Sequence, residues 1–273
     1  DEAEKFHANL VEKVAEEDEV LIEKYLNGES ISEIEIKSAL RKATIAQKIF
    51  PVLAGAAFKN KGVQPLLDAT VDYLPSPLDK KAIEGKLPID LDKRVTCDTD
   101  FASPSVALAF KIANDPFAGA LVYLRLYSGT IKVGDSLLNP RTEKRERITK
   151  LLKMHANNRT EVHEIKAGDI CAAIGLKTVA TGDTLCDPKR PVILESISFP
   201  EPVISVAIEA KSSSEQEKMM SGLEKLVKED PSAKLRTDAD TGQILLSGMG
   251  ELHLEILVDR LFREHKVQAN VGK

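Results

Sequence analysis

Residues 242–271 read "GQILLSGMGELHLEILVDRLFREHKVQANV", and this stretch decides the fold of the last part of the chain. Its opening, "GQILLSG", is a short apolar run between glycines, which is typical of a buried strand. From Gly250 to His265 the leucines recur at helical spacing, and apolar and polar residues alternate again from 266 to 271. The stretch therefore predicts a strand, a helix and a second strand in succession.

The residues just before this stretch complete the pattern. They predict a strand at 202–210, a helix at 213–230 and a strand at 233–238, which the turn "ADTG" joins to the next strand. The inward face of the helix is predicted to consist of Met219, Leu223, Leu226 and Val227. The order βαββαβ is that of the ferredoxin-like sandwich, so residues 199–273 are predicted to form such a domain.

Further upstream, apolar residues recur at every second position, which is typical of strands. Alternating runs lie at 105–115, 120–131, 135–140, 145–156 and 169–177, and Gly-Asp or Ser-Gly pairs mark several of the turns. Short strands at regular spacing predict a closed antiparallel β-barrel over residues 104–195. The Pro- and charge-rich residues 79–103 are predicted to be a linker.

Residues 1–78 are predicted to be mostly helical. One helix covers 1–26 and stops at Asn27-Gly28, a second opens at a capping box of Ser30 and Glu33, and a third runs over 62–74. Residues 49–53 predict a single strand, which leads into "AGAAFKNKGVQ" (54–64). A lone strand leaves its backbone groups without partners, so we expect the rest of its sheet to lie in chain outside this sequence. The predicted fold class is thus multidomain α+β: the tail of an α/β domain, an antiparallel β-barrel and a ferredoxin-like sandwich.

Composition narrows the protein class. The 273 residues carry a net charge of -5, which excludes a global attraction to nucleic acid. The three cysteines are odd in number and far apart, so they predict neither a disulfide framework nor a zinc site and indicate a reducing, cytoplasmic setting. No apolar run is long enough to span a membrane, and no signal peptide is visible at Asp1. We expect a monomer that does not bind membranes.

An acidic run, Glu16 to Glu19, lies on the first predicted helix. Such a run is most often a solvated face, and the alternative is a docking surface for a basic partner.

The sequence contains no self-contained catalytic constellation. It has no Gly-x-x-x-x-Gly-Lys-Ser/Thr loop and no Asp-x-x-Gly, so a phosphate cradle and a magnesium site are missing. His253 lacks a second histidine four residues on, which excludes the zinc-protease helix pattern. Glu251, Glu255 and Asp259 recur along one helix face and could bind a metal, but with Arg263 they favour surface ion pairs. We assign no catalytic residue and no metal ligand.

Basic residues gather between 141 and 159, where Glu143 and Glu146 are the opposing acids. Alternation places Arg145, Arg147 and Lys153 on one face of the predicted strand 145–156. Two interpretations stay open: contact with RNA phosphates, or a solvated barrel edge protected by charge. The predicted RNA-contact set is Arg141, Lys144, Arg145, Arg147, Lys150 and Lys153.

The predicted ferredoxin-like domain lacks the side chains of two common functions. Its strand "GQILLSG" has no aromatic residue to stack RNA bases, and the domain has no Cys-x-x-Cys for a metal. A mechanical role between other domains is the remaining hypothesis.

Five segments together resemble a known family: "LYSGTIKVGD" (126–135), "KLLKMHANNRTEVHEIKAGDI" (150–170), "FPEPVISVAIEA" (199–210), "EDPSAKLRTDADTGQILLSGMGELHLEILVDRL" (229–261) and "ANVGK" (269–273). They closely resemble bacterial-type translation elongation factor G, over nearly all of the chain. "VLAGAAFKNKGVQPLLDATVDYLPSP" (52–77) is similar to the end of that family's GTP-binding domain. The resemblance implies a fragment: the end of the GTPase domain, then domains II and III.

The resemblance implies a ribosomal translocase that couples GTP hydrolysis to movement of tRNA and mRNA. The intact protein would bind GTP and Mg²⁺, and this fragment alone is expected to bind neither and to be inactive. Gly55, Ala56 and Ala57 would be the remnant of the guanine-contacting turn, which in the family usually reads Gly-Ser-Ala. The loss of the serine removes a hydroxyl that braces this turn. The implied partners are small-subunit ribosomal RNA and protein, and the GTPase and C-terminal domains of the same chain.

Three rival interpretations remain. The chain could belong to a sibling translational GTPase, such as a tetracycline-resistance ribosomal protection protein or an organellar homologue. It could instead be a freestanding, non-enzymatic RNA-binding module, or a scaffold with no ribosomal role.

Overall fold

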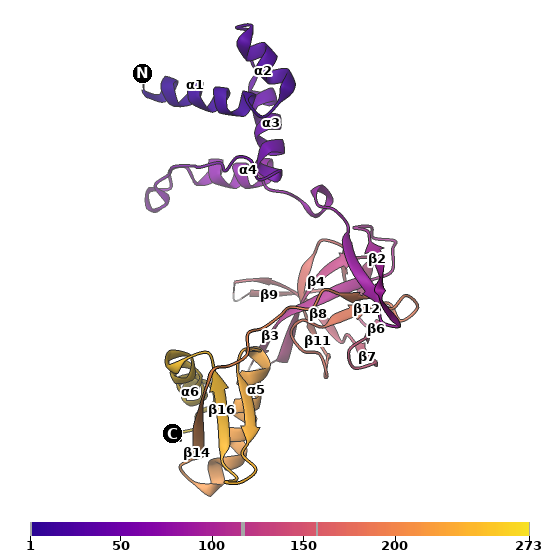
Figure 1. The fold of residues 1–273 in the computed structure, drawn as a ribbon, viewed down its shortest axis with the longest axis vertical. Coiled ribbons are helices and arrows are strands. Elements are labelled where there is room, and N and C mark those ends of the chain that lie inside the picture. The colour runs from indigo at the N-terminus through magenta and orange to yellow at the C-terminus, as the bar shows by residue number, and fades with distance from the viewer. Residues whose placement is uncertain (1, 116–117, 157, 273) are drawn as a thin grey trace. The chain divides into compact units, whose positions relative to one another are not determined.

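A computed structural model describes residues 2–115, 118–156 and 158–272 (Figure 1). The chain divides into two compact units, residues 1–81 and 82–273, which we describe separately.

The first unit consists of helices. Its elements are α1 (Glu2–Ala15), α2 (Glu19–Leu26), α3 (Glu33–Ile45), the short 3-10 helix η1 (Ala57–Lys59), α4 (Val63–Tyr73) and η2 (Pro77–Asp79). A small core of Val14, Ala15, Leu21, Ala39 and Leu40 packs α1, α2 and α3 together. Arg41 fastens α3 to the end of α4, because its guanidinium donates to the carbonyl of Asp72 at 2.8 Å and pairs with Asp79.

Two helix predictions in this unit need correction. The predicted helix 1–26 is two helices, because the Asp18 side chain accepts from the N–H of Val20 and Leu21 and caps the start of α2. The capping box lies at Ser32 and Glu35 rather than at Ser30 and Glu33, which moves the start of α3 two residues downstream. The predicted stop is confirmed, since Gly28 adopts a left-handed φ of 71° directly after α2.

The predicted strand at 49–53 is wrong. These residues form no strand, and the nearest bridge is a single pair, Ala56 with Lys61. Within the described part of the first unit no neighbouring strand is present to receive their backbone hydrogen bonds, which a strand requires.

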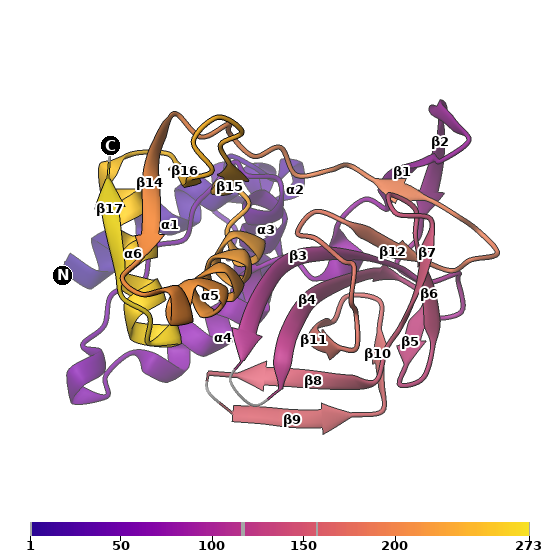
Figure 2. The ribbon, with the colours of Figure 1, turned by 90° about the horizontal axis from the view of Figure 1, so that it is seen from below.

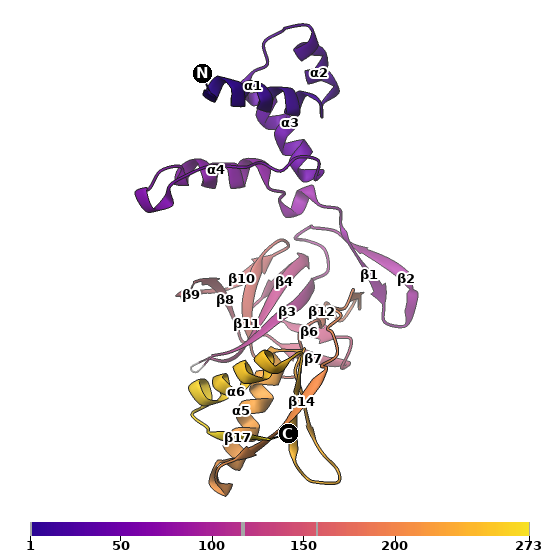
Figure 3. The same ribbon diagram turned by 60° about the vertical axis from the view of Figure 1, so that its left-hand side comes forward.

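The second unit begins with a β-hairpin where the sequence predicts a linker. The strands β1 (Ile83–Leu87) and β2 (Asp90–Cys97) pair antiparallel, and β1 also pairs with β13 (Ile193–Leu194). Figure 3 shows this hairpin. The prediction for residues 79–103 is wrong because Pro88 lies in the turn between the two strands, and because most side chains of β2 are exposed, so its many charges are compatible with a strand. Gly85 is needed here, since a Cβ would lie 2.9 Å from the carbonyl oxygen of Ile193.

Most of the remaining strands of residues 104–194, which we call the barrel module, belong to one antiparallel sheet. Among the described residues this sheet has eight strands in the order β7-β6-β12-β3-β4-β11-β8-β9. The bounds are β3 (Val106–Asp115), β4 (Gly119–Ser128), β6 (Ser136–Asn139), β7 (Lys144–Arg147), β8 (Lys150–His155), β9 (Asn158–Val162), β11 (Ile170–Ile174) and β12 (Thr184–Cys186). A separate pair is formed by β5 (Thr130–Lys132) and β10 (Glu164–Lys166).

The barrel sheet curls around one hydrophobic core. The N–H of Ile148 donates to the carbonyl of Asp135, just before β6, and the N–H of Thr149 donates to the carbonyl of Ile174, at the end of β11, so the segment between β7 and β8 is hydrogen-bonded on both sides. Buried side chains from β3, β4, β5, β6, β8, β10, β11 and β12 meet in that core. The predicted single strand 145–156 is therefore two strands, broken at Ile148-Thr149.

Residues 199–273, which we call the ferredoxin-like module, follow the predicted order. The elements are β14 (Ile204–Ala210), α5 (Gln216–Glu229), β15 (Lys234–Thr237), β16 (Ile244–Gly248), α6 (Glu251–His265) and β17 (Ala269–Gly272). The antiparallel sheet has the order β15-β16-β14-β17, with α5 and α6 beside it (Figure 2). Met219, Leu223 and Leu226 face the core as predicted, and Val227 is partly buried against it.

Candidate functional site

The predicted guanine-contacting turn is a tight exposed loop. The N–H of Ala56 donates to the carbonyl of Lys61 at 3.0 Å, and the N–H of Lys61 donates back to Ala56 at 3.1 Å. Ala57 opens η1, and Asn60 closes it in a left-handed conformation with φ of 51°. Gly55, Ala56 and Ala57 are all exposed.

Two glycines set the shape of this loop. A Cβ on Gly55 would lie 3.0 Å from the carbonyl oxygen of Lys61, and one on Gly62 would lie 3.1 Å from the Cα of Gly55. Gly62 also has a φ of 76°. Within the described part of the chain, the N–H groups of Gly55 and Ala57 form no hydrogen bond. The loop therefore presents backbone donors, which suit an oxygen acceptor such as that of a purine base.

Arg141, the first residue of the predicted RNA-contact set, is held by the barrel module itself. Its guanidinium pairs with Asp183 through Nε and Nη2, the latter at 2.8 Å, and Nη2 also donates to the carbonyl of Thr178 at 3.2 Å. Asp183 is buried and accepts from Asn139 and from the N–H of Ala180, each at 2.8 Å. This arrangement makes Arg141 an anchor for the loop between β11 and β12.

Burial alone would raise the pKa of Asp183. The hydrogen bonds from Arg141, Ala180 and Asn139 outweigh that effect, so the pKa lies below its usual value and the carboxylate stays charged.

On strand β7 the three cations are exposed and the one acid is buried. Lys144, Arg145 and Arg147 are exposed, whereas Glu146 is buried, 4 % exposed. Glu146 accepts from the N–H of Lys177 at 2.8 Å and of Thr178 at 2.9 Å, so its charge holds the loop after β11. In the sequence Glu146 is an acid that opposes the basic residues. In the structure it faces the interior, which leaves β7 more positive on its outer side than its sequence indicates.

The strand β8 carries Lys150 and Lys153, both exposed and both paired. Lys150 Nζ lies 2.5 Å from Glu161, and Lys153 Nζ lies 3.3 Å from Asp169. The prediction that Arg145, Arg147 and Lys153 share one strand face is wrong, because β7 and β8 are separate strands with different neighbours. Arg145 and Arg147 do share a face of β7, while Lys150 and Lys153 point to opposite sides of β8.

His253 has a structural role, as a histidine outside any zinc-protease pattern is expected to have. Its Nδ1 accepts from the N–H of Met249 at 3.0 Å, so its Nε2 carries the proton and donates to Asp230 at 2.8 Å. The side chain thus ties the turn before α6 to the end of α5. Asp259 and Arg263 form an ion pair at 2.6 Å, in line with the predicted surface pairing of that helix.

Neither a metal centre nor a membrane span is found in the described residues. In the ranges that the structure covers, no group of three or more His, Cys, Asp or Glu side chains is placed to hold a metal ion. None of the helices described is long and apolar enough to cross a membrane.

Comparison with known proteins gives the family. Residues 199–273 match the model of Elongation Factor G, domain III, and residues 119–186 match that of Elongation factor Tu domain 2. Elongation factor G 1 of Bdellovibrio bacteriovorus is 65 % identical over 273 residues, which are 100 % of this chain and 39 % of that protein. A crystal structure from Thermus thermophilus aligns with a TM-score of 0.77 and 30 % identity, over 98 % of this chain and 38 % of that one. The chain thus spans about two-fifths of the length of the relative it matches. It belongs to the elongation factor G family.

Proposed function

We propose that this chain is part of a ribosomal translocase, the elongation factor that couples GTP hydrolysis to movement of tRNA and mRNA during translation. The observation that carries the proposal is the alignment with an elongation factor G, which covers the full length of the chain at 65 % identity. That identity, with the domain III match, favours the elongation factor over a ribosomal protection protein and over a freestanding RNA-binding module. We place this activity in the cytoplasm, in a monomer that binds no membrane.

Within this function, we assign residues 1–78 to the end of the GTP-binding domain, 104–195 to domain II and 199–273 to domain III. GTP and Mg²⁺ would bind to the intact protein. This chain would contribute the turn Gly55–Ala57, whose free N–H groups fit a guanine oxygen, and the chain alone would not hydrolyse GTP. Support for the last point is the absence of a phosphate-loop motif from the sequence.

The proposed contact with small-subunit ribosomal RNA lies on the barrel module. Support comes from β7, where Lys144, Arg145 and Arg147 are exposed and the intervening acid is buried. Such cations bind phosphates without reading sequence, and their contribution weakens with salt. Arg141, Lys150 and Lys153 would contribute less to phosphate binding, because each already forms an ion pair with an acid of the module. Small-subunit protein and the other domains of the elongation factor are the further partners that we propose.

A chimaera tests the proposed function. In elongation factor G 1 of B. bacteriovorus, the matching 39 % would be replaced by this chain, and GTP hydrolysis would be measured with and without ribosomes. We expect ribosomes to stimulate the chimaera about as strongly as the parent protein. A folded chimaera that binds GTP but does not respond to ribosomes would contradict the proposal.

A further inference from the structure

The barrel module and the ferredoxin-like module keep separate hydrophobic cores. In the described ranges, the buried cluster around Leu124 and the one around Leu223 share no residue. The two modules nevertheless meet where the end of β3 lies against α5. Their joint therefore depends on contacts other than a common apolar core.

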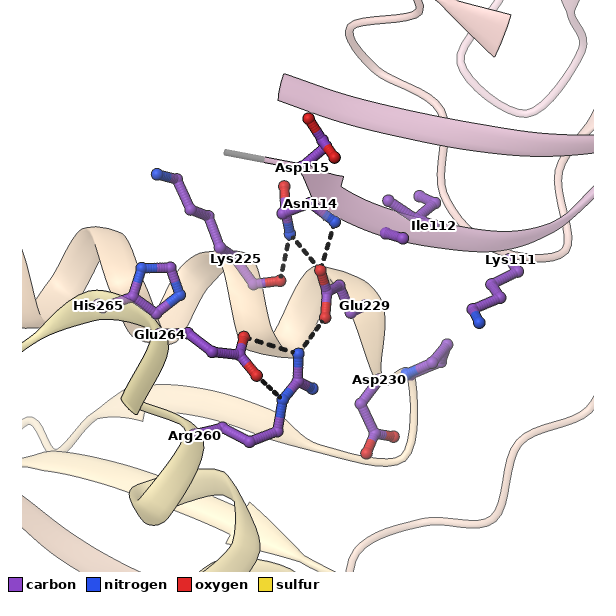
Figure 4. Close-up of a pocket in the computed structure, with 12 residues that line it drawn as sticks. Lys111, Ile112, Asn114, Asp115, Lys225, Glu229, Asp230, Arg260, Glu264 and His265 are labelled. Carbon is purple, nitrogen blue, oxygen red and sulfur yellow. Dashed lines mark hydrogen bonds and ion pairs between the residues drawn. The ribbon is translucent and has the colours of Figure 1, made fainter. Parts of the chain in front are cut away.

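The hydrogen bonds at this joint centre on one carboxylate. Asn114 of β3 donates from Nδ2 to Glu229 Oε1 at 2.9 Å, and its backbone N–H donates to the same oxygen. The Nδ2 group also donates to the carbonyl of Lys225 at 3.2 Å. A weaker contact joins Lys228 Nζ to the carbonyl of Lys177 at 3.5 Å. Figure 4 shows Glu229 between the strand and the helices.

Glu229 is also paired inside its own module. Its second oxygen accepts from Arg260 Nη2 at 2.6 Å, and Arg260 binds Glu264 through Nε at 2.7 Å and Nη2 at 3.0 Å. The Glu229 side chain is 14 % exposed, and a cavity of about 920 Å³ lined largely by charged side chains lies beside it. Without a partner, a charge as buried as this would be costly, and Arg260 removes that cost whether or not Asn114 is present.

We propose that Glu229 is a releasable latch between the two modules. In the closed state it accepts from Asn114 and from Arg260. In the open state Glu229 still accepts from Arg260, and the N–H groups of Asn114 bind water instead. Opening therefore exposes neither hydrophobic core and leaves no buried charge unpaired. A joint of this kind permits the ferredoxin-like module to swing on the barrel module. The latch goes beyond the proposed function, and its test needs no ribosome.

The test measures the distance between the modules in the whole chain by double electron–electron resonance. One spin label is attached at His163→Cys in the barrel module and one at Glu255→Cys on α6, both exposed positions. The native Cys97, Cys171 and Cys186 are buried, at 5 %, 1 % and 0 % exposed, and the unmodified chain measures any background labelling. In the parent we expect one narrow distance distribution.

Two variants open the latch by different means. Glu229→Ala removes the acceptor, and Asn114→Asp places a second carboxylate against Glu229 without changing α5 or α6. Both are expected to shift and broaden the distance distribution, and Asn114→Asp with Glu229→Gln is expected to narrow it again because the amide can donate to the new carboxylate. The matched control is Glu264→Ala, which removes a partner of Arg260 but leaves the joint intact and should keep the parent distribution.

The outcomes decide the proposal even where one variant is unstable. Circular dichroism shows whether α5 and α6 persist, and if Glu229→Ala unfolds them, the distribution of Asn114→Asp decides alone. Distributions for folded Glu229→Ala and Asn114→Asp that superimpose on the parent's would overturn the latch. So would an equal broadening in Glu264→Ala, since that would show a general loosening of the helices.

Discussion

At the residue scale, two buried carboxylates hold a loop of the barrel module, although their sequence context predicts exposed charges. Glu146 lies in "KRER" and Asp183 in a Gly-Asp turn, and both look solvated in the sequence. In the structure each accepts backbone N–H groups and holds the loop between β11 and β12. Sequence patterns could not reveal this, because the inward direction of Glu146 depends on partners more than thirty residues away, Lys177 and Thr178.

Asp183→Asn should lower the stability of the barrel module by about 2–3 kcal/mol at pH 7, since charged hydrogen bonds to Arg141 and Asn139 are weakened. The pKa of Asp183 is depressed in the folded state, so its stabilisation is full above the unfolded pKa of about 3.9 and is lost as pH falls through the folded value. Hydrogen exchange of β3 and β12 amides measures this. The variant should lose less protection than the parent between pH 5 and pH 3, and an equal loss in both would contradict the assignment.

At the element scale, the βαββαβ order was predictable because each strand and helix of residues 199–273 carries its own period. The breaks inside the other elements were not predictable in the same way. Ile148-Thr149 separates β7 from β8 without any glycine or proline, and Asp18 separates α1 from α2 within an acidic run. The strand predicted at 49–53 had the right apolar run, but pairing depends on neighbours that a local pattern does not specify.

The crossing of α5 and α6 depends on Gly222. A Cβ there would lie 2.6 Å from Leu261 Cδ1 and 3.1 Å from His265 Cγ, so the two helices approach closely at this point. We expect Gly222→Val to destabilise the ferredoxin-like module by about 1–3 kcal/mol through overpacking. The exposed neighbour Ser221→Val is the control for placing a β-branched side chain in this helix away from the crossing. Urea titration followed by far-ultraviolet circular dichroism tests this, and equal midpoints for the two variants would show that the close approach is not needed.

At the scale of the whole molecule, the parts have different proposed tasks: a nucleotide-contacting turn in the first unit, and cations on the barrel module of the second. The likeness to elongation factor G was recognisable in the sequence because long segments match that family, and it is confirmed by comparison. The RNA-contact residues remain a prediction. The structure places three of them, Lys144, Arg145 and Arg147, together on β7.

Arg145→Ala with Arg147→Ala should weaken ribosome binding of the chimaera and reduce the slope of log affinity against log salt by about one for each phosphate that is no longer bound. Lys93→Ala with Arg94→Ala, on the exposed hairpin strand β2, removes the same charge elsewhere and should leave the slope unchanged. Ribosome affinity of each double variant is measured over a series of salt concentrations, and the two slopes are compared. Identical slopes for both double variants would contradict RNA contact by β7. They would support the alternative, in which β7 is a solvated sheet edge protected by charge.

The isolated chain should bind GTP too weakly to measure, because it would contribute only the one turn that we propose contacts the base, and its sequence contains no phosphate-loop motif. Isothermal titration with GTP and Mg²⁺ checks this. Micromolar affinity would mean that the chain holds a nucleotide site that its motifs do not indicate.

The most direct test of the central claim is the movement of mRNA by one codon, read by toeprinting on ribosomes that carry tRNA in both sites. The chimaera with this chain in place of the matching part of the B. bacteriovorus protein is predicted to advance the toeprint by three nucleotides in the presence of GTP, as the parent does. A chimaera that folds and hydrolyses GTP on the ribosome, yet leaves the toeprint where it was, would contradict the claim that this chain belongs to a translocase.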